Sequence, residues 1–126
     1  MTQPRHLAPQ PDRATVLTRA VLRAAERLGL TGRQLAQIIG VSEATVSRLK
    51  RGEAQLEDGT KSFQLAALLV RAFRSLDAIT GGDEAVARAW LGAPNTALAA
   101  PPVERMFTVQ GLVDVTTYLD DRRAPL

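Results

Sequence analysis

The chain has no cysteine and few aromatic residues, and each shortage excludes a class of structure. Without cysteine, its 126 residues cannot form a disulfide framework or a thiolate metal site, which suits a reducing compartment. Aromatic residues make up only 4% of the sequence, so leucine, alanine and valine must do most of the packing. This composition predicts one globular domain with a modest core, or one domain with a small appendage.

Long apolar segments are missing as well. The longest apolar run, Phe63 to Val70 with Gln64 inside it, is far too short to span a lipid bilayer. The sequence does not open with a basic and then apolar leader, so we do not expect export. We therefore expect a cytoplasmic protein that has no membrane partner.

Side chains that usually carry out catalysis are scarce. The single histidine, His6, lies in the Pro- and Gln-rich segment 1–11, which we expect to be a disordered tail. The sequence has no glycine-rich phosphate loop and no spaced cluster of acids for a metal ion. These shortages argue against an enzyme and predict a binding protein with no catalytic residues, no metal site and no cofactor.

Positive charge is concentrated in the front of the chain. Residues 1–51 contain nine Lys/Arg against three Asp/Glu, whereas residues 52–126 contain seven against ten. A basic front and an acidic rear favour a polyanion partner at one end and a different partner at the other. A solvated helix surface would give the same pattern, so the motifs must decide between the two.

Helix signals cover most of the chain, and we find neither a β pattern nor a repeat, so the sequence predicts an all-α fold. Seven of the eight residues from Phe63 to Val70 are apolar, and a helix of that kind needs cover on more than one side. This favours a central helix, a dimer interface, or both. The expected helices are 13–28 after the cap Asp12, 31–39 from Thr31 to the stop at Gly40, 43–51 after Ser42, 60–80, 83–91, and 109–120 after Thr108, with a short turn over 103–106.

The second and third of these helices form a specific pattern. A short helix, a turn that contains Gly40 and a second short helix match the helix-turn-helix arrangement. Such a second helix enters the major groove of DNA with its N-terminal residues towards the base edges. The whole stretch, "TGRQLAQIIGVSEATVSRLKRG", resembles the Xre/Cro-type helix-turn-helix. Inward positions are then Leu35, Ala36, Ile39, Val41, Val46 and Leu49, and outward ones are Ser42, Glu43, Ala44, Thr45, Ser47 and Arg48.

The chemistry of the polar residues and this resemblance together predict which of them contact DNA. Thr31 and Ser42 stand at helix N-termini, where hydroxyl and N–H groups can hold phosphates. Arg48 suits a guanine, while Glu43 suits a cytosine amine or simply complements the helix dipole. Arg33 is a phosphate candidate or an ordinary solvated arginine. The other expected contacts are Ala44, Thr45 and Ser47 on the outer face, and Lys50 and Arg51 along the DNA backbone.

The rear half contains a second recognisable pattern. The segments "GGDEAVARAW", "WLGAPNTAL" and "GLVDVTTYL" resemble the toxin-binding domain of the Xre/MbcA/ParS antitoxins. Members often have glycines and a single proline where this chain has "LAAPP", and here a polar tail, "DDRRAPL", follows the last helix. From the residues alone, Trp90 is expected to be a core anchor, and Gly111 implies a close approach to its backbone.

The resemblance implies a type II antitoxin whose partner is a RES-domain toxin that consumes NAD⁺ or transfers ADP-ribose from it. It also implies a homodimer, repression of its own operon through operator DNA, and a C-terminal region placed over the toxin's NAD-binding cleft. A stand-alone dimeric transcriptional repressor without a toxin partner is the alternative. The domains would be the tail 1–11, a helix-turn-helix DNA-binding region over 12–58 and a helical toxin-binding and dimerisation domain over 59–126.

The end of the chain is where the resemblance places the toxin contact. Acidic side chains there could meet basic groups of the cleft, and basic ones could meet acids at its rim. A frayed, solvated helix end would explain the same residues equally well. The candidates are Tyr118, Asp120, Asp121, Arg122 and Arg123.

Overall fold

The structure, a computed structural model, describes residues 12–123, and within that range every regular element is a helix. The expected all-α fold is therefore confirmed, while the predictions for 1–11 and for the last three residues lie outside the described range. No helix within this range is long and apolar enough to cross a bilayer. The helices are α1 (Arg13–Leu28), α2 (Gly32–Ile39), α3 (Glu43–Lys50), α4 (Lys61–Ile79), α5 (Glu84–Gly92), α6 (Pro102–Arg105) and α7 (Val109–Arg123).

Short-range hydrogen bonds fix where the helices begin. The Asp12 carboxylate accepts from the Thr15 N–H at 2.8 Å, and this bond lowers the pKa of Asp12 below its usual value. Thr31 and Gln34 form the expected capping box, with the two bonds at 3.0 and 2.9 Å. The hydroxyl of Thr108 accepts from the Gly111 N–H at 3.0 Å and so begins α7 as predicted.

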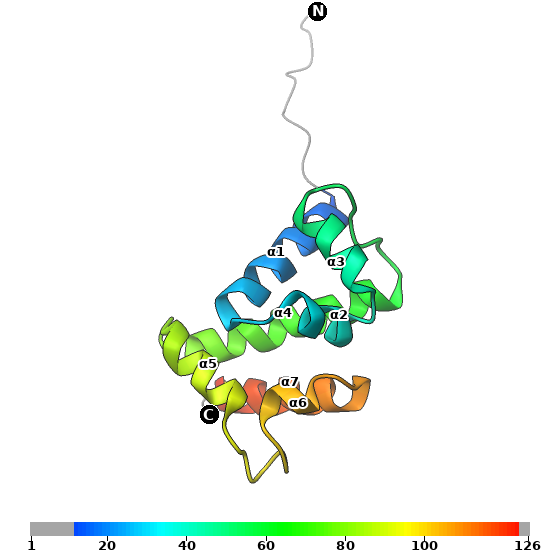
Figure 1. The fold of residues 1–126 in the computed structure, drawn as a ribbon. Coiled ribbons are helices and arrows are strands. Elements are labelled where there is room, and N and C mark those ends of the chain that lie inside the picture. The colour runs from blue at the N-terminus through cyan, green and yellow to red at the C-terminus, as the bar shows by residue number, and fades with distance from the viewer. Residues whose placement is uncertain (1–11, 124–126) are drawn as a thin grey trace, which may run out of the picture.

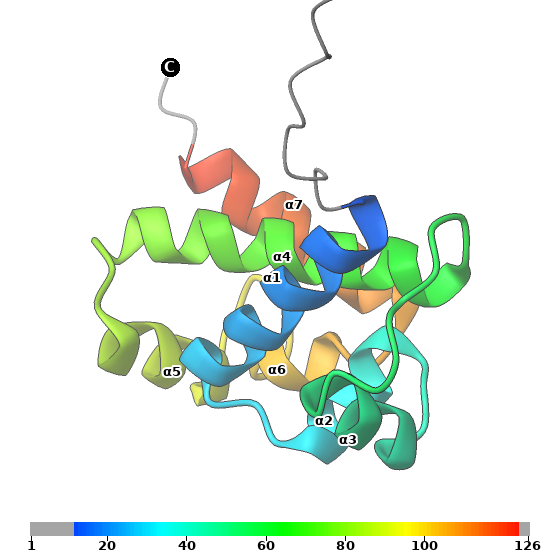
Figure 2. The ribbon, with the colours of Figure 1, turned by 90° about the horizontal axis from the view of Figure 1, so that it is seen from above.

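The long helix α4 lies at the centre of the molecule. Figure 1 shows it crossing the middle, with α1 and α3 above it and α6 and α7 below, and Figure 2 shows α1 crossing it from another side. Its inward side chains are covered by α1, α2 and α7 of the same chain. The apolar pattern therefore reflects a central helix, which was the first of the predicted alternatives. The buried residues of α4 are Phe63, Ala66, Leu69, Val70, Ala72, Ser75 and Leu76.

The last helix is longer than predicted and is fixed at both ends. It continues to Arg123, so Asp121 and its neighbours belong to a helix and not to a tail. At its start, a Cβ on Gly111 would lie 1.8 Å from the carbonyl oxygen of Arg105, so only glycine allows α6 and α7 to approach this closely. The close approach expected from the sequence is present. Near its end, Asp120 pairs with Arg71 and accepts from the Ser75 hydroxyl at 2.7 Å, which joins α7 to α4.

Candidate nucleic-acid and partner interfaces

The pair α2 and α3 is held to the core by apolar side chains. Leu35 and Ile39 of α2 and Val46 and Leu49 of α3 are all buried, as predicted. Gly40 joins the two helices with a left-handed φ of 73°, and its N–H donates to the Ala36 carbonyl at 2.9 Å. This packing leaves the opposite face of α3 in solvent.

The exposed face of α3 gathers the predicted base-facing residues on one side. The Thr45 Oγ1 accepts from Ser42 at 3.0 Å and from the Arg48 guanidinium at 3.1 Å, so these three side chains form one connected row. Because Thr45 holds it, Arg48 lies along the surface of α3 beside the helix N-terminus. Exposed residues on this face are Ser42, Glu43, Ala44, Ser47 and Arg48, with Thr45 half-buried.

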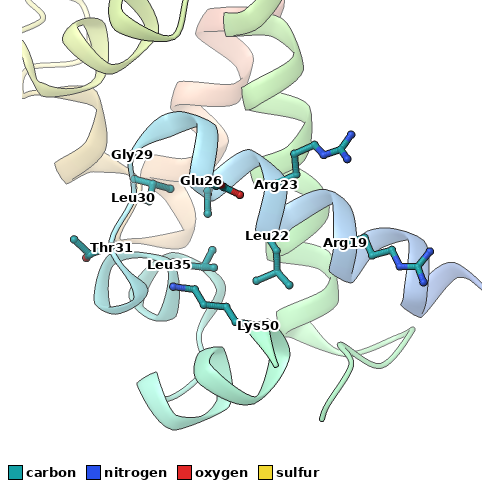
Figure 3. Close-up of a pocket in the computed structure, with 10 residues that line it drawn as sticks. Arg19, Leu22, Arg23, Glu26, Gly29, Leu30, Thr31, Leu35 and Lys50 are labelled. Atoms are coloured by element: carbon teal, nitrogen blue, oxygen red, sulfur yellow. The ribbon is translucent and has the colours of Figure 1, made fainter. Parts of the chain in front are cut away.

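The residues predicted to lie along the DNA backbone separate into two groups. Lys50 folds back over the start of α2, where its Nζ is 3.5 Å from the position of a Cβ on Gly32. It lines a hollow of about 710 Å³ together with Thr31, as Figure 3 shows. Arg33 is exposed on the same short helix. Arg51, in contrast, pairs with Glu53 at 3.1 Å on the surface, where such a pair contributes little.

Two arginines of α1 border the same hollow and were not predicted as site residues. Arg19 and Arg23 line it, and in Figure 3 the side chain of Arg23 points away from Lys50. Their spacing of four residues, which places both on one helix face, was a signal that the sequence contained.

At the opposite end of the molecule, three planar side chains stack on the surface. The rings of Trp90 and Tyr118 lie 6.0 Å apart at 24° to each other, and the Arg122 guanidinium is 3.4 Å from the centre of the Tyr118 ring. Trp90 packs against the core but is only half-buried, so it is less enclosed than the predicted core anchor. We call Trp90, Tyr118 and Arg122 the aromatic stack.

The other predicted residues near the end of the chain have different surroundings. Asp121 and Arg123 are exposed at the end of α7, and Arg123 also lines a hollow between α1 and α4. Asp120 is half-buried, and its carboxylate already holds Arg71 and Ser75 of α4. The end of α7 therefore offers two cations and one free acid, while Asp120 positions the helix that presents them.

A basic, exposed second helix on a helix-turn-helix defines a DNA-binding protein, and the appended helices α5 to α7 add a second surface. The family profile described as "Antitoxin Xre-like helix-turn-helix domain" matches residues 8–71. A second profile, "Antitoxin Xre/MbcA/ParS C-terminal toxin-binding domain", matches residues 75–124. The chain belongs to the Xre-type antitoxin family: it is a type II antitoxin with a DNA-binding and a toxin-binding domain. Both families are regulatory domains of antitoxins. The search of curated proteins found no match.

Proposed function

We propose that this antitoxin neutralises a RES-domain toxin, which consumes NAD⁺ or transfers ADP-ribose from it, by covering the toxin's active site. In the same proposal it acts in the cytoplasm as a homodimer that represses its own operon. The proposal also divides the chain into two regions: residues 12–58 bind DNA, and residues 59–126 bind the toxin and form the dimer. The helix α4 serves both parts, because it packs against α1 and α2 as well as against α7.

The observation that carries the toxin half of the proposal is the aromatic stack. Trp, Tyr and Arg are the side chains that most often dominate binding energy at protein interfaces. Here all three stand together at the surface of the toxin-binding domain, and Asp121 and Arg123 are exposed on the same last turn of α7 as Arg122. We assign these five residues to the toxin contact. Asp120 would join it only by leaving Arg71, so we give it a positioning role.

The DNA half of the proposal rests on the connected row of Ser42, Thr45 and Arg48. A guanidinium held in place loses less conformational freedom when it pairs with a guanine. Thr31 and Lys50 both line the hollow at the start of α2, where a helix N-terminus and an ammonium group favour a phosphate. The remaining assigned residues are Arg33 and Arg51 on the DNA backbone, and Glu43, Ala44 and Ser47 in the groove.

A homodimer would place two helix-turn-helix units on half-sites about one turn of DNA apart. The apolar residues of α4 are largely covered within the chain, so the contact between two copies needs apolar side chains on another helix. Val109 and Val113, one turn apart on α7, are 61% and 37% exposed and provide such a face. Sedimentation at micromolar concentration tests this part. A monomer that still binds palindromic DNA tightly would contradict it.

Co-expression with a RES-domain protein encoded beside this chain tests the proposal as a whole. We expect the two proteins to co-purify, and we expect Arg122→Glu to weaken the complex while duplex binding stays unchanged. Lys61→Glu is the matched control, because Lys61 is an exposed cation on α4, away from the aromatic stack. Failure of the wild-type chain to bind such a toxin, with tight operator binding retained, would favour the stand-alone repressor.

A further inference from the structure

A groove between α1 and α4 is not assigned to the DNA contact or the dimer contact proposed above, and it shares only Arg123 with the proposed toxin contact. It consists of two adjoining hollows of about 620 Å³ each, which share Val16, Ala20, Val70 and Arg74. Its floor is apolar, and Val16 is 52% exposed there. The other apolar residues of the floor are Leu17, Phe63, Ala67 and Phe73.

Both walls of the groove are lined by arginine. Seven arginines border the two hollows, and among residues 12–123 no carboxylate does. Arg27 and Arg71 are paired with acids that lie outside the groove, and Arg13 pairs with Asp58 at its outer edge. The other lining arginines are Arg19, Arg23, Arg74 and Arg123, and within the described residues Arg19, Arg23 and Arg74 form no ion pair.

We propose that this groove binds an acidic amphipathic helix of a partner protein. An exposed apolar floor between two cationic walls is complementary to a helix with an apolar stripe and carboxylates along both its edges. Like charges spaced four residues apart, as in Arg19 and Arg23, repel each other until an anion lies between them. Arginine suits this role because its planar guanidinium binds a carboxylate through two hydrogen bonds.

Two other occupants fit the groove less well. A DNA backbone would satisfy the arginines, but it would leave Val16 and Ala67, the exposed part of the apolar floor, without a partner. A second copy of the chain would offer the Val109 and Val113 face of α7. That face has Gln110 and Thr117 beside it, so it does not supply two rows of acids.

The test uses the full chain and a synthetic helical peptide of about 18 residues, or five turns, with leucine along one face, glutamate along both edges and alanine elsewhere. Fluorescence anisotropy at physiological salt measures its binding. Two further peptides separate the contributions: one has glutamine in place of each glutamate, and the other has serine in place of each leucine. We expect micromolar binding of the first peptide and at least about tenfold weaker binding of the other two.

Substitutions in the protein then locate the site. The double variant Arg23→Ala/Arg74→Ala should weaken binding of the acidic peptide by about tenfold, and Val16→Ser should weaken it by about threefold. Lys61→Ala is the control, since it removes an exposed cation from α4 outside the groove and should leave binding unchanged.

Three results would overturn the proposal. Binding that is unchanged in the double variant would place the peptide elsewhere. A loss of duplex binding in the double variant, equal to its loss of peptide binding, would assign the groove to DNA. A dimer that dissociates in the double variant would assign it to a second copy of this chain. The toxin takes no part in these measurements. A result that contradicts the groove proposal is therefore distinguishable from one that contradicts the proposed antitoxin function.

Discussion

Replacing Gly111 with alanine should destabilise the protein, although helix propensity alone predicts the opposite. In an open helix, alanine is more favourable than glycine by roughly 1 kcal/mol. At this position the new Cβ would lie 1.8 Å from the carbonyl oxygen of Arg105 and 2.7 Å from its carbonyl carbon. Both atoms belong to the backbone, so no side chain can rotate away to relieve the overlap.

The overlap determines the sign of the effect. Even a tight contact of 3.0 Å requires α6 and α7 to separate locally by about 1 Å, in a region where Met106 and Leu112 are almost fully buried. Forced displacements of this kind usually cost about 1–3 kcal/mol. We therefore expect a net loss of about 1–3 kcal/mol in the free energy of unfolding, with a melting temperature lower by at least about 3 °C.

Gly92→Ala is the matched control for this experiment. Gly92 also lies in a helix, but no atom would come within 4 Å of its added Cβ, so only the propensity gain remains. Thermal and urea unfolding, followed by circular dichroism, compare the two variants with the wild type. Equal or greater stability of the Gly111→Ala protein would refute the close packing of α6 on α7.

Four further changes test the separate interfaces. Arg48→Ala should cost about 1–3 kcal/mol of binding free energy at the operator and relax the sequence preference at one base pair. Equal losses of affinity on operator and scrambled duplexes would contradict the placement of α3 in the major groove. Lys50→Ala should weaken all duplexes alike and reduce the salt slope by about one unit, as titrations at several salt concentrations would measure. Asp12→Asn should remove a contribution to stability that is present at neutral pH and is lost as the pH falls through the lowered pKa of Asp12, so denaturation curves of the variant and the wild type should converge in acid. Tyr118→Ala should reduce protection against the toxin in a growth assay but leave operator binding intact, and full protection would place the contact elsewhere.

The local features of this fold could be predicted because they depend on neighbours in the sequence. The capping box of Thr31 and Gln34, the glycine turn at Gly40 and the cap at Ser42 each need only three or four residues. Together they determine the ends of α2 and α3, and with them which face of α3 is exposed. This is why the outward position of Ser42, Ser47 and Arg48 could be predicted from the pattern.

Features that depend on how α4 meets α7 could not be predicted in this way. Asp120 was a candidate for the toxin contact, with a solvated helix end as the alternative, and neither reading included the contacts with Ser75, 45 residues earlier, and Arg71 that hold Asp120 against α4. The extension of α7 to Arg123 and the stacking of Trp90 on Tyr118 likewise depend on tertiary packing. The arginine-lined groove could not be predicted from the sequence because its two walls belong to helices far apart in the chain.

The most direct test of the proposed neutralisation is the NAD⁺ content of cells that express the proposed RES-domain toxin together with this chain. We predict that the wild-type chain and Arg48→Ala keep NAD⁺ at the level of toxin-free cells, because the proposed toxin contact does not include α3. Arg122→Glu combined with Tyr118→Ala should let NAD⁺ fall while the variant stays folded and binds its operator. NAD⁺ depletion in cells with the wild-type chain, or full retention with the double variant, would contradict this mechanism.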